Sequence, residues 1–90
     1  MEIRFSPQAQ EDIEYWKKSG NQMIMNKISA LLNDIAAHPF AGTGKPEPLK
    51  YDLSGCWSRR INWEHRIIYA VREKENDIYI LALRYHYTKK

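Results

Sequence analysis

The spacing of apolar residues changes once along this chain of 90 residues, close to residue 38. Before that point, five aliphatic residues recur at i, i+4, i+7, i+8 and i+11, the spacing of one helical stripe: Ile24, Ile28, Leu31, Leu32 and Ile35. After it, apolar and polar residues alternate in short runs, which is typical of β-strands. Helices followed by strands predict an α+β fold, with the helices on one face of a sheet.

The part before the change contains one short strand and two helices. The run MEIRF predicts a strand over residues 2–5. Ser6 and Pro7 are suited to the start of a helix, because a serine hydroxyl caps exposed N–H groups and proline lacks the N–H that would go unpaired there. Gly20 is a natural end for this helix. A second helix over about Asn21–Ala37 follows so closely that the two helices form an antiparallel hairpin.

The part after the change begins with a loop, HPFAGTGKPEPLK, which spans residues 38–50 and contains three prolines. The alternating pattern then predicts four strands: Tyr51–Leu53, Trp57–Trp63, Arg66–Arg72 and Ile78–Tyr85. Their connections are too short for parallel crossovers, so the sheet is mostly antiparallel in the order β-α-α-β-β-β-β. The helix hairpin covers one face of this twisted sheet and leaves the other face partly open.

Length and composition limit the classes of protein that this chain can belong to. Ninety residues build one modest core, so residues 1–90 are expected to form a single domain. No apolar run approaches the ~20 residues of a membrane helix, and the start does not resemble a signal peptide. The single cysteine, Cys56, has no partner for an internal disulfide. These features indicate a cytoplasmic protein that makes no membrane contact.

Positive charge is concentrated in the second half of the chain. Residues 44–90 contain ten lysines and arginines against six acidic residues, together with Trp57, Trp63, Tyr69, Tyr79, Tyr85 and Tyr87. A basic surface with interspersed aromatic side chains is suited to binding a polyanion. A solvated basic face of a small protein would give the same composition.

Several polar residues interrupt the strand pattern and are candidates for chemistry. Glu47 lies between two prolines in the loop, where a stiffened backbone could present a base, although a solvated loop glutamate is the alternative. Arg59 and Arg60 are adjacent in a strand, so one faces the helices and the other the open side, where it could bind phosphate. Arg66 shares a face with apolar residues and requires an acid or a ligand unless the strand end is exposed.

The closing run RYHY contains Arg84, His86 and Tyr87. Alternation places Arg84 and His86 on one face. His86 can donate or accept a proton near neutral pH, because an unperturbed histidine titrates near ~6.5. Together, a glutamate base, an arginine and a histidine acid suit cleavage of RNA by its own 2′-hydroxyl group, a reaction that DNA cannot undergo.

Other chemistries are less well supported. His38, His65 and His86 are scattered, with no zinc-ligand spacing, so no metal or other cofactor is expected. The GTGK run is too short for a phosphate-binding P-loop. Ser54 and Ser58 lack an evident catalytic setting.

Three stretches together resemble a known family: GKPEPLKYDLSGCWSRRI, EHRIIYAV and RYHY. They resemble the Txe/YoeB type of toxin in the RelE/ParE superfamily of bacterial toxin–antitoxin systems, over nearly the whole chain. The resemblance implies a RelE-like, microbial-RNase-like fold and an enzyme that cleaves mRNA in the ribosomal A site.

The resemblance also implies a role for each site residue. Glu47 corresponds to the general base, His86 to the general acid and Arg66 to the cation that stabilises the transition state. Lys50 and Arg60 would support the phosphate, and Tyr87 would orient the substrate. Arg59 and Arg84 complete the set of candidate phosphate ligands.

The resemblance implies partners and leaves alternatives. A YefM/Axe-like antitoxin that folds on binding is expected, with DNA contact only through the antitoxin complex, and a homodimer is possible. A ParE-like toxin or binding protein of the same fold, without nuclease activity, is the alternative function. The chain departs from the family at Cys56, where an aromatic residue is usual, at Trp63, and at Thr88–Lys90, which follow the final tyrosine.

Overall fold

Both helices begin and end at the residues that the sequence predicts. The computed structural model describes residues 1–86, with side chains as far as Tyr85. Helix α1 spans Pro7–Ser19; the Ser6 hydroxyl accepts a hydrogen bond from the Ala9 N–H (3.0 Å), and Gly20 ends the helix with a left-handed φ of 69°. Helix α2 spans Gln22–Ala37, and the Asn21 side chain caps its first turn.

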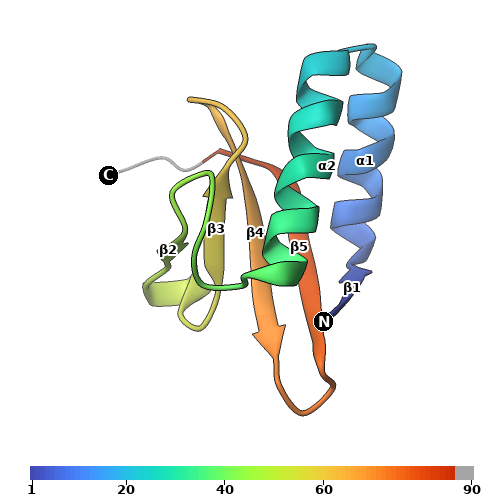
Figure 1. Ribbon diagram of the computed structural model, residues 1–90. Coiled ribbons are helices and arrows are strands. Elements are labelled where there is room, and N and C mark those ends of the chain that lie inside the picture. The colour runs from blue at the N-terminus through green and yellow to red at the C-terminus, as the bar shows by residue number, and fades with distance from the viewer. Residues whose placement is uncertain (87–90) are drawn as a thin grey trace.

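The five strands form one mixed sheet in the order β1-β5-β4-β3-β2. Strand β1 (Glu2–Phe5) pairs parallel to β5, and every other pairing is antiparallel, as predicted. The remaining strands are β2 (Glu47–Pro48), β3 (Trp57–Arg60), β4 (His65–Arg72) and β5 (Asp77–His86). Figure 1 shows the two helices side by side on one face of this sheet. The predicted α+β architecture is therefore confirmed.

The core lies between the helices and the sheet. The helices contribute Trp16, Ile28, Leu31 and Ile35, and the sheet contributes Ile67, Tyr69, Ile78, Ile80 and Leu83, all almost completely buried. Burial of apolar side chains on both sides of this interface is the main force that holds the hairpin on the sheet. Among residues 1–86, no helix has the length and apolar character to cross a membrane.

The predicted strand at Tyr51–Leu53 is wrong. These residues form a short 3-10 helix, η1, in which the N–H groups of Leu53 and Ser54 bond to the carbonyls three residues earlier. Tyr51 has a left-handed φ of 58°, which a β-strand does not accommodate. The strand that precedes β3 is instead β2, inside the proline-rich loop.

The ends of two other strands also differ from the prediction. Strand β3 stops at Arg60 rather than Trp63, because the Asn62 side chain accepts hydrogen bonds from the N–H groups of Glu64 and His65 and forms a turn. Strand β4 therefore begins one residue early, at His65. The polar turn before β5 is confirmed, with Asn76 in a left-handed conformation.

The face of the sheet opposite the helices is less open than predicted. Ile68 and Ser58 lie on this face near its centre, and both are almost completely buried. At the β1 end of the same face, Asp77 accepts two hydrogen bonds from Arg72 (both 2.7 Å). Asp77 also forms an ion pair with Arg4 (3.2 Å). At this end of the face, the charges of Arg4, Arg72 and Asp77 neutralise one another. Toward β2, by contrast, two arginines lie opposite each other.

The Arg72–Asp77 pair predicts how stability depends on pH. Hydrogen bonds from Arg72 lower the pKa of Asp77 below its ordinary value. The ionised carboxylate therefore stabilises the fold at pH 5, and the contribution is lost as the pH falls through the lowered pKa. We expect the free energy of unfolding to fall from about pH 5 to pH 2, and to fall less steeply in Asp77→Asn. Urea titrations would measure this, and Asp52→Asn, at an exposed site in η1, should keep the wild-type slope.

Candidate active site

Glu47 and Arg66, which are 19 residues apart in sequence, form an ion pair at the β2 end of the sheet. The Arg66 Nη1 lies 3.1 Å from Glu47 Oε2 and also donates to the Ser58 hydroxyl at 3.1 Å. The ladder explains the contact, because Glu47 pairs with Ser58 and Ser58 pairs with Ile68, two residues from Arg66. The arginine side chain is 14% exposed and the glutamate side chain 57%. The carboxylate of Glu47 is therefore open to solvent, while the guanidinium of Arg66 is mostly buried and bonded to Ser58.

Two basic residues and one tyrosine lie in a row across three strands at this end. Arg60 on β3 pairs with Arg66 on β4, and Arg66 pairs with Tyr85 on β5. Like charges opposite each other repel, so this row is stabilised by an anion. Glu47 supplies one negative charge, and Arg60 is exposed and forms no ion pair with the described side chains. The row can accommodate a further anion such as a phosphate group.

The predicted phosphate ligand Arg59 is wrong, because this side chain is completely buried on the helix side. All its N–H groups are used within the protein: by Asp34, by the hydroxyl of Tyr69, and by the backbone carbonyls of His38, Ala41 and Thr43. Of the two adjacent arginines, Arg60 takes the outward position. Arg59 has no donor left for a substrate.

The role that the structure gives to Arg59 is to hold the loop that leads to Glu47. Its bonds to three carbonyls fix residues 38–43, and Tyr69 adds a bond to the Pro39 carbonyl at 2.7 Å. Gly42 is required beside this network, because a Cβ there would lie 2.0 Å from the Asp34 carboxylate. Hydrogen bonding from Arg59 lowers the pKa of Asp34, and burial raises the pKa of the Tyr69 hydroxyl. The network therefore keeps the carboxylate ionised and the phenol protonated near neutral pH.

Two further candidates, Lys50 and Arg84, form no hydrogen bond or ion pair with Glu47 or Arg66 among the described side chains. Lys50 is exposed and immediately precedes η1, three residues after Glu47. The guanidinium of Arg84 lies 3.6 Å from the centre of the Tyr15 ring, so it stacks on α1 instead. Shifts of register between β4 and β5 interrupt the simple alternation from which the position of Arg84 was predicted.

The closing RYHY run is described only in part. The backbone of His86 is the last residue of β5 and pairs with His65, one position along β4 from Arg66. This register places the backbone of His86 one residue beyond Tyr85, which pairs with Arg66. The side chain of His86 and the whole of Tyr87 lie outside the described residues, so their roles stay predictions.

The sequence did not reveal the contribution of Ser58. Its hydroxyl is completely buried and accepts a hydrogen bond from Arg66, so it helps to orient the guanidinium. Ser58 lies two residues before Arg60 and therefore on the same face of β3, which is a signal present in the sequence. The sequence did not show which residues of β4 lie opposite Ser58 and Arg60. Cys56 is half-buried, and burial raises the pKa of its thiol, which disfavours the reactive thiolate.

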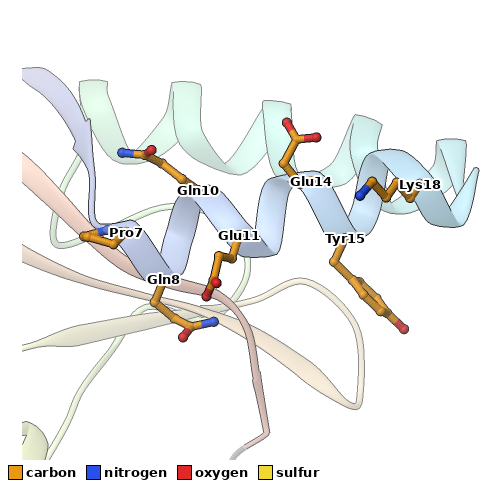
Figure 2. Close-up of a pocket in the computed structure, with 7 residues that line it drawn as sticks. All are labelled: Pro7, Gln8, Gln10, Glu11, Glu14, Tyr15 and Lys18. Atoms are coloured by element: carbon orange, nitrogen blue, oxygen red, sulfur yellow. The ribbon is translucent and has the colours of Figure 1, made fainter.

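The carboxylate of Glu47 lies at the surface of the described part of the chain, where its side chain is 57% exposed. A groove of about 860 Å³ runs along the outer side of α1, and neither Glu47 nor Arg66 lines it. Figure 2 shows its lining, with Gln8, Glu11 and Tyr15 projecting to one side of the helix. An exposed carboxylate beside two arginines of neighbouring strands suits a long polymer better than a small molecule.

Comparison with solved structures places this fold among bacterial toxins. A YoeB/ParE toxin from Agrobacterium tumefaciens superposes with a TM-score of 0.90 at 38% identity, covering 97% of this chain and all of that one. The toxin–antitoxin complex of YoeB and YefM from Staphylococcus aureus matches with a TM-score of 0.83 at 44% identity, covering 97% and 98% of the two chains. The fold and site therefore define a toxin of the RelE/ParE class.

The sequence comparisons identify the family within that class. The family model for the YoeB-like toxin of bacterial type II toxin–antitoxin systems matches residues 5–87. The toxin YoeB of Escherichia coli K12 is 46% identical over 87 residues, which are 97% of this chain and the whole of that protein. This chain belongs to the YoeB-like toxin family, as the resemblance of its motifs predicted.

Proposed function

We propose that this toxin is a ribosome-dependent endoribonuclease that cleaves mRNA in the A site without a metal ion and so inhibits translation. Toxins of this family are endoribonucleases, which supports the reaction class. The observation that carries the proposal is the Glu47–Arg66 pair at 3.1 Å, held beside the exposed Arg60. It joins a base and a cation at an anion-binding surface.

The proposed reaction uses the 2′-hydroxyl of the RNA as its nucleophile. Glu47 removes the 2′ proton, and the 2′ oxygen forms a new bond to the adjacent phosphorus. The bond from phosphorus to the 5′ oxygen breaks, and His86 delivers a proton to that oxygen. The products are a 2′,3′-cyclic phosphate and a 5′-hydroxyl, so atoms and charges balance without a co-reactant.

Arg66 and its neighbours act on the phosphate. The guanidinium already lies between Glu47 and Ser58, so it can turn toward a non-bridging oxygen as the base accepts its proton. Charge developing on the phosphate during attack strengthens this contact in the transition state. Arg60 and Lys50 attract the RNA backbone, and Tyr87 orients the substrate.

The proposed partners follow from the relatives. One S. aureus relative forms a heterotetrameric complex with YefM and another structure from that organism is a YoeB dimer. A cognate YefM-like antitoxin that folds on binding would neutralise this toxin, and a homodimer is the corresponding free state. Contact with DNA would come through the antitoxin complex. The ribosomal substrate places the toxin in the cytoplasm.

The direct test is cell-free translation with the purified protein. The 5′ ends of the mRNA fragments are mapped by primer extension, and their 3′ ends are tested for a cyclic phosphate by resistance to phosphatase before acid treatment. We expect cleavage only of mRNA on ribosomes, within the A-site codon. Normal translation in the presence of folded protein would contradict the proposal, and inhibition without cleavage would favour a ParE-like toxin that is not a nuclease.

A further inference from the structure

The last part of β5 departs from a regular antiparallel ladder. Tyr69 pairs with Ile80 and its neighbour Ile68 pairs with Ala82. Strand β5 therefore contains one residue more than β4 between these two pairs. A second shift follows before Arg66 pairs with Tyr85. Such bulges leave backbone groups without ladder partners and bend the strand. They lie between the core and the end of β5, where the backbone of His86 is located.

Side chains from α1 and its cap bind the backbone of β5 at these bulges. The Leu83 N–H donates to Asp12 Oδ2 at 2.9 Å, and the Leu83 carbonyl accepts from Trp16 Nε1 at 2.8 Å. One turn earlier, the Ser6 hydroxyl donates to the Leu81 carbonyl at 2.9 Å. Three side chains of one helical segment therefore supply partners to the irregular part of the strand.

These side chains are buried in a way that hydrophobic packing alone does not explain. Asp12 is 4% exposed and occupies the apolar face of α1 beside Trp16, which is 5% exposed. A buried carboxylate is costly unless it is hydrogen-bonded, and Asp12 is bonded on both oxygens, by Leu83 and by Gln8 Nε2 (2.9 Å). An aliphatic residue would pack at this position, but it would leave the Leu83 N–H without a partner.

The same helix also reaches the neighbours of His86. The Trp16 ring meets the His65 ring edge to face, with centres 5.0 Å apart, and His65 is the residue that pairs with His86. Arg84, two residues before His86, stacks on Tyr15, which Figure 2 shows projecting from α1 on the same side as Gln8 and Glu11. The strand end is thus held at Leu83, at Arg84 and through its partner on β4.

We infer that Asp12 and Trp16 are positioning residues, which fix the bulged backbone at Leu83 and thereby set the place of the His86 backbone at the end of β5. The inference rests on the proposed function, in which His86 is the acid. A bulged strand can slip in register, because its ladder bonds do not specify one arrangement there. The two bonds to Leu83 select one arrangement, so the helix layer controls the geometry of a site on the opposite layer.

The test compares Trp16→Phe with wild type in single-turnover cleavage of mRNA on programmed ribosomes. Phenylalanine keeps an aromatic ring but removes the N–H that binds Leu83. We expect kcat to fall roughly 10–100-fold, since a small misplacement of a reacting group has an effect of this size, while KM changes less than about twofold. Asp12→Ala should behave similarly, and Asp12→Asn, which keeps an acceptor for the Leu83 N–H, should recover most of the rate.

A matched control separates positioning from loss of stability. Ile35→Val, a truncation in the buried face of α2, is compared at a temperature where it and Trp16→Phe are equally folded. Amide hydrogen exchange at residues 83–85 should accelerate in Trp16→Phe and not in Ile35→Val. A Trp16→Phe protein whose kcat equals that of Ile35→Val, when His86→Ala is inactive, would overturn the inference. Full activity of His86→Ala would instead refute the role of His86 in the proposed function.

Discussion

Arg66→Ala is expected to remain folded and to cleave mRNA about 10²–10³-fold more slowly than wild type. The guanidinium contacts both Glu47 and Ser58, a residue of the neighbouring strand β3. In the proposed reaction it lies where charge develops on the phosphate, so its loss is expected to remove stabilisation of the transition state and not of the fold. Single-turnover rates on mRNA bound to ribosomes measure the effect.

Two further variants test whether the effect depends on the position and shape of the Arg66 guanidinium or only on positive charge. Arg66→Lys keeps a positive charge but cannot bond to Glu47 and a phosphate with one planar group, so we expect an intermediate rate. Arg72→Ala removes an arginine from the same strand and face, at the end where it binds Asp77. It should cleave at a rate near wild type. Equal losses in Arg66→Ala and Arg72→Ala would show that general basic charge, and not a placed cation, drives cleavage.

The sequence predicted the elements of the fold well because their signals are local. Ser6, Gly20 and Asn21 each act within one turn of a helix, and their effects are visible in the order of residues alone. The failure at Tyr51–Leu53 has a physical cause, since alternation over three residues does not distinguish a strand from a 3-10 turn. The left-handed backbone at Tyr51 follows from closing the loop between β2 and β3, which is not a local property.

The candidate site was predictable in its residue types but not in its contacts. Alternation indicated that Arg59 and Arg60 face opposite sides, but which side holds the helices depends on the register of β3 against β4. The bulges in β5 likewise have no signature in the run ILALRYHY. The pairing of Glu47 with Arg66 depends on β2, a strand of two residues inside a loop with three prolines.

Glu47 and His86, the candidate base and acid, belong to the least regular strands of the sheet. Buried polar side chains on the helix side bind the backbone that precedes each of them. The network of Arg59 and Asp34 fixes the loop before Glu47. The bonds of Asp12 and Trp16 fix the strand before His86. Buried hydrogen bonds of this kind hold an irregular stretch of backbone in one conformation. This explains why costly polar groups are present inside a core of a 90-residue chain.

The role of His86 leads to a prediction that separates an acid from a binding residue. We expect His86→Ala to cleave ordinary mRNA about 10²–10⁴-fold more slowly than wild type, because the leaving 5′ oxygen then departs without a proton. In an mRNA whose scissile 5′ oxygen is replaced by sulfur, the leaving group is a much weaker base and needs no acid. The same variant should therefore cleave the sulfur-containing mRNA at a rate close to that of wild type.

Glu47→Gln provides the contrast for this experiment, because it removes the base and keeps the neighbouring groups. Sulfur in the leaving position does not help to remove the 2′ proton, so we expect Glu47→Gln to stay slow on both substrates. Rescue of His86→Ala without rescue of Glu47→Gln would assign the two proton transfers to opposite ends of the reaction. If sulfur restored neither variant, His86 would act by binding RNA or by completing the ladder between β4 and β5, where its backbone pairs with His65.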